Sequence, residues 1–236
     1  MRARHGHLGW WPGETPFEVC VGAILTQNTS WTHVERAIAN LKSVGVLEPG
    51  KLFALPETRL AQLIRPAGYF NVKARRLRAF LRVLVEECGG DLDRLFAGAT
   101  AKVRERLLAI HGIGPETADS MLLYAGAHHS FVIDAYTKRI FFRHGWCQAN
   151  TDYGQLKRLC EASLNRQAPP ARLDYWQDYH AQLVMVGKDF CRPRLPRCEQ
   201  CPLRPLLPPP EWNDSQDYSH RRPPSHRSRN SKHALF

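Results

Sequence analysis

Apolar residues recur at intervals of three or four positions along most of the chain, which gathers them on one face of a helix. Glycines such as Gly45, Gly68 and Gly112 fall between these segments and not inside them. Only 130–133 reads as extended, and it is too short to found a sheet. The pattern predicts an all-α fold, with helices within 34–41, 77–88, 102–111, 115–125, 135–143, 153–164 and 175–186.

The length of the chain limits the number of its domains. Its 236 residues, 43% of them apolar, suffice for one large domain or two small ones with a buried core. After Cys201 the composition changes, first to proline and then to Ser, Arg, His and Asn. Such a segment can bury little surface, so we expect 211–236 to be a disordered basic tail.

The charge points to a polyanionic partner. Lys and Arg total 33 against 22 Asp and Glu, which leaves a net charge of +11. This surplus favours nucleic acid first and an anionic membrane second, with a basic solubility surface as the plain alternative. No apolar run reaches the ~18 residues that span a bilayer, and the N-terminus leads to no secretory h-region. We expect a cytoplasmic monomer, nucleoid-associated if bacterial.

The cysteines do not form a disulfide framework. Seven is an odd number, and three of them, Cys191, Cys198 and Cys201, are crowded together. This arrangement predicts metal or cluster ligands in an intracellular protein.

The sharpest local motif is Gly112-Ile113-Gly114, which lies between two helical segments. Two glycines around one apolar residue allow a tight turn. The amides of the turn and the N-terminus of the next helix then offer a site for a DNA phosphate, without sequence preference. Many helix–helix turns contain glycine, so the motif depends on its basic context.

Asp134 follows the apolar run Phe131-Val132-Ile133 at the start of a predicted helix. Taken alone, it is an N-cap. At the edge of a DNA groove, its carboxylate could instead stabilise a positively charged sugar or orient a water molecule.

The chain resembles the helix-hairpin-helix DNA glycosylases of the endonuclease III superfamily. The matching stretches are 25–29, 67–74, the hairpin 112–118 and 132–134, in the family's order. The resemblance implies two helical lobes around a DNA groove, one of residues 18–128 and one of 1–17 plus 129–210. It also implies a catalytic Asp134 and a Gln27 that wedges into the base stack. Lys73 is expected to contact the DNA backbone, with a solvated helix face as the alternative.

Glu116 is the departure that decides the chemistry. Bifunctional members of the family carry a lysine here, which forms an imine with the sugar and cuts the strand. A carboxylate cannot form an imine, so the resemblance implies a monofunctional glycosylase without β-lyase activity, acting on damaged bases in double-stranded DNA.

A second resemblance, to the 3-methyladenine DNA glycosylase branch of the family, implies the substrate class. It rests on Trp10-Trp11-Pro12 and the acidic hairpin 116–119. In that branch, aromatics matching Trp10, Trp11 and Trp31 line the base pocket with Pro12, and a lysine matching Lys188 approaches it. Indole faces attract a cationic alkylated base by stacking and cation–π forces, although tryptophans are more often core residues.

The family's [4Fe-4S] cluster has four cysteine ligands, and the fourth position here is Leu207. Three readings stay open: a cluster with an outside ligand such as Cys160 or a tail histidine, a zinc ion, or a metal-free loop. We favour a cluster.

Other functions share these features. A uracil or T:G mismatch glycosylase would keep Asp134 and lack the lysine. A non-catalytic DNA-binding protein would keep the hairpin, and a structural metal protein would keep the cysteine loop.

Overall fold

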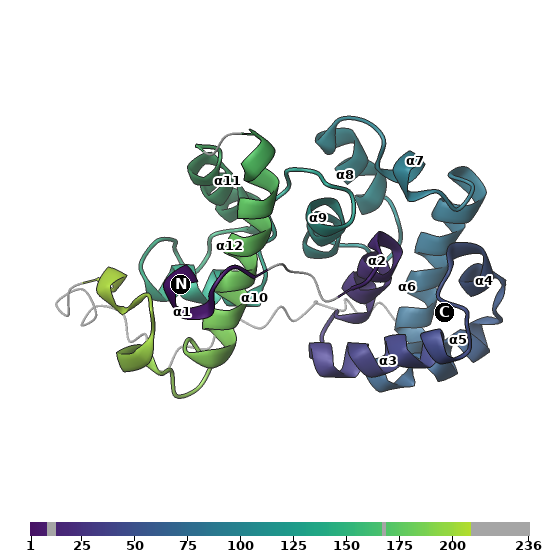
Figure 1. Ribbon diagram of the computed structural model, residues 1–236, viewed down its shortest axis with the longest axis horizontal. Helices are drawn as coiled ribbons and strands as arrows, with labels where there is room; N and C mark the ends of the chain where they lie inside the picture. Colours follow the sequence, from purple (N-terminus) through teal and green to yellow (C-terminus); the bar gives the residue numbers. More distant parts are fainter. Residues whose placement is uncertain (9–12, 167–168, 209–236) are drawn as a thin grey trace, which may run out of the picture.

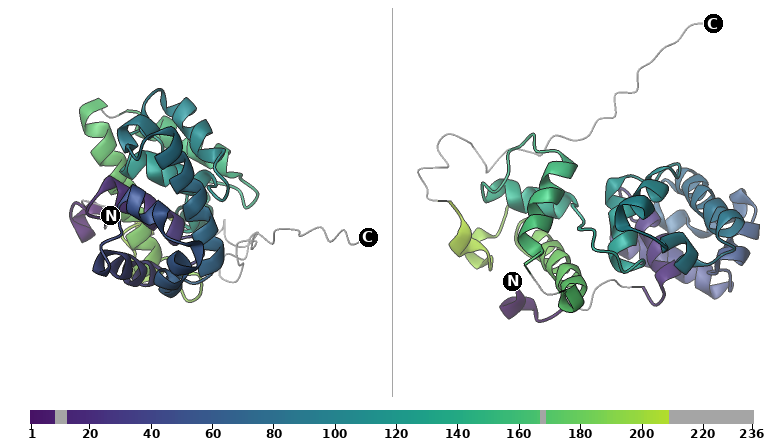
Figure 2. Two further views of the ribbon diagram at one scale, coloured as in Figure 1. Left: turned by 90° about the vertical axis from the view of Figure 1, so that its right-hand side faces the viewer. Right: turned by 90° about the horizontal axis from the view of Figure 1, so that it is seen from above.

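Two groups of helices lie side by side in the computed structural model, which describes residues 1–8, 13–166 and 169–208 (Figures 1 and 2). The first group contains α2 (Pro16–Leu25), α3 (Trp31–Ser43), α4 (Pro49–Ala54), α5 (Glu57–Leu63), α6 (Phe70–Arg82), α7 (Leu92–Phe96), α8 (Thr100–Leu108) and α9 (Pro115–Tyr124). The second contains α1 (Arg2–His5), α10 (Ala135–Arg143), α11 (Tyr153–Leu164) and α12 (Pro169–Asp189).

Short helical turns complete the described chain. A π-helical turn, Val83–Glu87, extends α6, and 3-10 turns cover Arg65–Ala67, Cys198–Gln200 and Arg204–Leu206. These ranges contain no β-strand, so the prediction of an all-α fold is confirmed. The expected tail at 211–236 lies outside the described residues. None of the described helices has the length and apolar composition that a bilayer-spanning segment needs.

Helix α9 belongs to both hydrophobic cores. Met121 and Leu122 are fully buried in the first core, which joins α2 to α9. The next residue, Leu123, is fully buried in the second, with residues of α10, α11 and α12. Because α9 has apolar residues on two sides, it packs against both groups of helices and lies between them (Figure 1).

Side-chain caps mark where several helices begin. The Thr15 side chain accepts a hydrogen bond from the Glu18 amide at α2. Asp152 forms a reciprocal capping box with Gln155 at α11. Such caps satisfy amides that the first turn leaves without partners and contribute about 1 kcal/mol each.

The first eight residues return to α12. The Arg2 guanidinium pairs with Asp178 at 3.2 Å, and the Leu8 amide donates to the same carboxylate at 2.8 Å. Gln182 accepts from His5 and donates to the Gly6 carbonyl. The N-terminal segment is thereby attached to the second group although the chain next enters the first.

A buried carboxylate, Asp119 of α9, links the two groups. Arg104 of α8 donates to both of its oxygens at 2.8 and 3.0 Å. Hydroxyls of Ser130 and Tyr153 donate to it at 2.5 and 2.7 Å, and Lys157 lies 3.4 Å away. Burying a charge is costly unless it is paired and hydrogen-bonded, and here the partners come from three parts of the chain: α8, the segment at Ser130, and α11.

We expect Asp119→Ala to lower the stability by about 3 kcal/mol or more, because it leaves the charge of Arg104 without its partner. In a chain of this size, that loss lowers the Tm by roughly 6–12 °C. Calorimetry should show this shift, with Glu105→Ala as the control. Glu105 forms an exposed pair with Lys102, which contributes little. Equal melting of both variants would contradict the role given to Asp119.

Candidate active site and DNA interface

A tight hairpin joins α8 to α9. Gly112 has a φ of +86°, which side chains other than glycine rarely adopt, and a Cβ there would lie 2.3 Å from Cγ of Arg76. The Ile113 side chain is buried in the first core, whereas Gly114 is exposed. The hairpin is therefore anchored by its apolar residue and stays open at Gly114, where α9 begins.

Gln27 is held against this hairpin. Its amide nitrogen donates to the Gly112 carbonyl at 3.0 Å and to the Thr117 hydroxyl at 2.9 Å. Its amide oxygen accepts a hydrogen bond from the Arg76 guanidinium. Both ends of the Gln27 amide are thus engaged in the free protein, and a wedging motion into DNA would have to exchange these bonds for others.

The prediction that Lys73 contacts DNA is wrong. Its side chain is only 1% exposed, and its ammonium donates to the carbonyls of Leu25 and Ala67 at 2.8 and 2.7 Å. Burial lowers the pKa of Lys73 to about 8, and the charge of Arg76 adds to this effect. Lys73 therefore links the C-terminal end of α2, which leads to Gln27, to the 3-10 turn Arg65–Ala67.

Asp134 has the geometry of an N-cap. One carboxylate oxygen accepts from the Thr137 amide at 2.7 Å, and the other lies 3.5 Å from Nε2 of His180. Its side chain is 13% exposed. Burial alone would raise the pKa of Asp134, but the contact with His180 and the bond from Thr137 hold it below its usual range. The carboxylate is therefore ionised although it is nearly buried.

Glu116 lies in the first turn of α9, with an exposed side chain. The protein around it partly excludes water and raises the pKa of Glu116 to about 7, and the negative charge of Asp134 acts in the same direction. Two carboxyl groups whose environments move their pKa values apart are typical of functional sites.

Residues 21–166 match the profile of the HhH-GPD superfamily of base excision DNA repair proteins. The chain belongs to this superfamily. A Methanocaldococcus jannaschii protein named as a DNA repair glycosylase is 46% identical over 201 residues, which cover 85% of this chain and 89% of the relative. The chain is thus a DNA repair glycosylase of the HhH-GPD superfamily, and DNA is its partner.

Solved structures of the superfamily share the fold. The structure of Helicobacter pylori 3-methyladenine DNA glycosylase, bound to 1,N6-ethenoadenine, is 29% identical with a TM-score of 0.68, covering 76% of this chain and 87% of that one. A non-covalent endonuclease III–DNA complex is 21% identical with a TM-score of 0.70, covering 87% and 89%.

The structure describes only part of the base pocket expected for this HhH-GPD protein. Trp10, Trp11 and Pro12 lie outside the described residues. Trp31 begins α3, half-buried against the first core. Lys188 is exposed in the last turn of α12, next to Gly187, where an added Cβ would lie 2.4 Å from Cδ1 of Tyr136. Pocket roles for these residues stay predictions.

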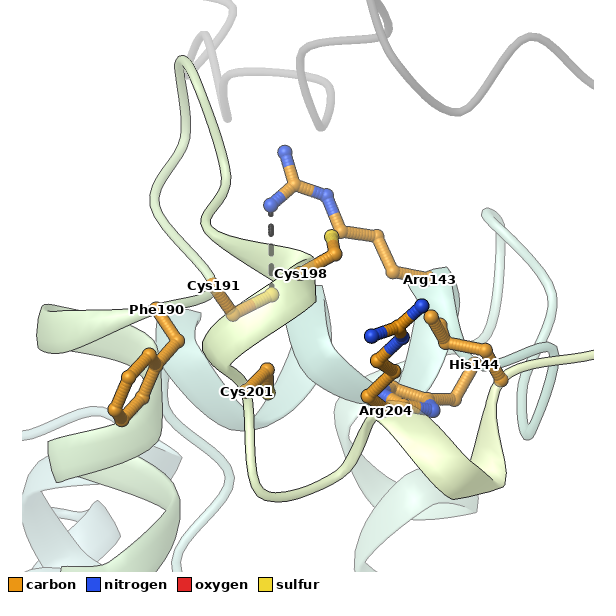
Figure 3. A pocket seen from close by; sticks show the side chains of 8 residues that line it. Arg143, His144, Phe190, Cys191, Cys198, Cys201 and Arg204 are labelled. Carbon is orange, nitrogen blue, oxygen red and sulfur yellow. Dashed lines mark hydrogen bonds between the residues drawn. The ribbon is translucent and has the colours of Figure 1, made fainter.

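The cysteine loop surrounds one small pocket, lined by Cys191, Cys198 and Cys201 together with Leu207 (Figure 3). The Leu207 side chain has no atom that binds iron, and Cys160 is buried elsewhere in the second core. Among the residues that the structure describes, no three His, Cys, Asp or Glu side chains converge as a metal site. The donor set therefore does not fit the superfamily's four-cysteine cluster.

Two arginines of α10 hold the loop through its backbone. Arg139 donates to the carbonyls of Gly187 and Cys191 at 3.1 and 2.6 Å. Arg143 donates to the Arg192 carbonyl at 2.6 Å and to the Cys191 sulfur at 3.4 Å (Figure 3). These bonds attach the cysteine loop to the second group of helices.

Sequence reasoning missed four residues that shape the site: Arg76, Thr117, Tyr124 and His180. Thr117 lies within the hairpin motif 112–118, whereas no motif of the sequence contains Arg76. The contact of His180 with Asp134 joins distant parts of the chain, so no local spacing indicates it.

We expect Gly112→Ala to weaken binding to undamaged duplex DNA and to lower the Tm, because alanine would strain the backbone and collide with Arg76. Fluorescence anisotropy and calorimetry measure the two effects. Gly50→Ala is the matched control, since that position has open space in α4. If both variants bind DNA equally well, the hairpin does not require its glycine.

Proposed function

We propose that this protein is a monofunctional DNA glycosylase that removes alkylated purines resembling 3-methyladenine. The observation that carries the proposal is the carboxyl group of Glu116 close to Asp134, at the position where bifunctional relatives place an amine. An imine with the sugar needs an amine, and hydrolysis does not.

The reaction is written as a hydrolysis at C1′ of the sugar. The bond between C1′ and the base nitrogen breaks, and the base leaves with the electron pair. A water oxygen bonds to C1′ and gives up one proton to the bulk solvent, so the products are the free neutral base, an intact abasic strand and a proton. Asp134, whose carboxylate is ionised and nearly buried, would stabilise the positive charge that develops on the sugar.

Charge supports the proposed substrate class. A base alkylated at a ring nitrogen is cationic and becomes neutral as it leaves, so it needs little protonation. Electron-rich indole faces favour such a base by about 1–2 kcal/mol per good contact. The likeness to the Helicobacter pylori 3-methyladenine DNA glycosylase supports this choice.

The proposal is tested with a base-release panel across alkylated, deaminated and oxidised duplexes. We expect release from methylated-purine DNA and little from U:G or T:G duplexes. Release of uracil or thymine alone, from U:G or T:G duplexes, would show that the substrate class is wrong and the hydrolysis is right. No release from any duplex would overturn the glycosylase proposal.

We expect Asp134→Asn to reduce base release by about 100-fold or more while DNA binding survives. Asparagine is as good an N-cap as aspartate, so the change removes the charge and keeps the start of α10. Asp152→Asn is the matched control, because Asp152 caps α11 in the same way. Base release by Asp134→Asn at the wild-type rate would exclude the electrostatic role.

The absence of lyase activity is tested on an abasic duplex with borohydride, which traps imines. We expect no covalent band and strand breaks only after alkali, with a bifunctional endonuclease III as the positive control for trapping. A band with the wild-type protein would contradict the monofunctional proposal. Its loss in Lys188→Ala would then identify the nucleophile.

A further inference from the structure

A buried histidine from the second group of helices faces the carboxylate of Asp134. His180 lies in α12 and is 4% exposed. Its Nε2 is 3.5 Å from Oδ2 of Asp134, which is close for an ion pair and long for a hydrogen bond. Contacts of this kind are often loose without substrate and shorten in the complex.

The other ring nitrogen of His180 is fixed by Tyr124, the last residue of α9. The Tyr124 hydroxyl lies 2.6 Å from Nδ1 of His180 and 3.2 Å from the Gln177 carbonyl. If the hydroxyl donates to the Gln177 carbonyl, its oxygen must accept a hydrogen bond from Nδ1–H of His180. Nε2 must then be protonated as well, because an unprotonated nitrogen would turn its lone pair toward the carboxylate of Asp134. If it donates to Nδ1, the neutral ring has its proton on Nε2. In either case Nε2 carries a proton and lies 3.5 Å from Oδ2 of Asp134, with no hydrogen bond formed in the free protein.

Aromatic rings hold the imidazole in this orientation. Phe131 packs against it edge-on, with centroids 6.0 Å apart and planes at 88°. The Tyr124 ring lies 5.7 Å away on a tilted plane. Because Phe131 is fully buried itself, the His180 ring has little room to turn.

We infer that His180 is a positioning residue, which presents Nε2–H to Asp134 and thereby keeps that carboxylate ionised and correctly oriented at the sugar. The inference rests on the proposed function, since it concerns the same carboxylate. Tyr124 acts through His180 by fixing the proton on the nitrogen that faces Asp134.

Other charged and titratable groups surround the pair. Glu116 and Tyr124 of α9 and Tyr136 of α10 interact with Asp134. Behind them, Lys138 acts on Glu116, Asp178 acts on Tyr124, and Arg139 acts on Tyr136. Without His180, the burial of Asp134 would raise its pKa with less to oppose it. The acid limb of the kcat–pH profile should therefore move to higher pH in a His180 variant.

The experiment measures kcat, KM and the acid limb for His180→Ala and His180→Gln on methylated-purine duplex. For His180→Ala we expect kcat at pH 7 to fall about 10- to 100-fold, with KM changed by less than about twofold and the acid limb raised. Glutamine keeps one N–H donor and should recover part of kcat. The kcat–pH profile is then measured again for the wild type and both His180 variants, each carrying Glu116→Gln as well. This change removes the other carboxyl group of the site, whose pKa is about 7.

Matched controls separate positioning from packing. His129→Ala removes another imidazole, one that lies between α9 and α10 and packs against Trp176 of α12. Tyr124→Phe removes only the hydroxyl that holds Nδ1 and should lower kcat less than His180→Ala does. Tyr179→Phe, whose ring also lies against Phe131, should leave kcat and the acid limb unchanged.

Failure of the positioning role of His180 can be distinguished from failure of the proposed glycosylase function. If wild type releases base and Asp134→Asn does not, the function stands. In that case, wild-type kcat and an unmoved acid limb in both His180 variants would overturn the positioning role. A fall in kcat without movement of the acid limb, equalled by His129→Ala, would reduce His180 to packing and overturn it as well.

Discussion

The buried carboxylate of Asp119 is the constraint on which the geometry of the site depends. A charge without water is stable only where several donors reach it, and here the donors come from α8, α11 and the segment at Ser130. Ser130 lies four residues before Asp134, while Asp119 lies three residues after Glu116 on α9. Satisfying this one charge therefore sets the distance between the hairpin helix and the segment that carries Asp134.

Periodicity predicted the amphipathic helices because one face of each is buried and the other is wet. It did not predict α2, in which every residue from Phe17 to Leu25 is buried, because a helix covered on all sides has no polar face to mark its period. The short helices α4, α5 and α7 contain too few turns to establish a period. Their existence depends on packing against the rest of the first core.

The residues of the site divide in the same way, into those with a local sequence signal and those without one. The hairpin glycines and Asp134 could be predicted because a turn and a helix start leave local signals. Lys73 was misplaced because a lysine beside arginines indicates a solvated helix face. The carbonyls that bind its ammonium belong to Leu25 and Ala67, 48 and 6 residues away in the chain, and no local spacing shows that they meet it. His180 is likewise invisible in sequence, since its role depends on how α12 packs beside α10.

The shared helix α9 has a consequence for the way the chain opens. Loss of either core would leave one apolar side of α9 exposed to water, so neither half retains its stability without the other. The two groups of helices thus form one cooperative unit, although they look like separate bodies. Amide hydrogens of α9 should exchange with solvent only through global unfolding, whereas those of the short helices at the edges can exchange by local opening.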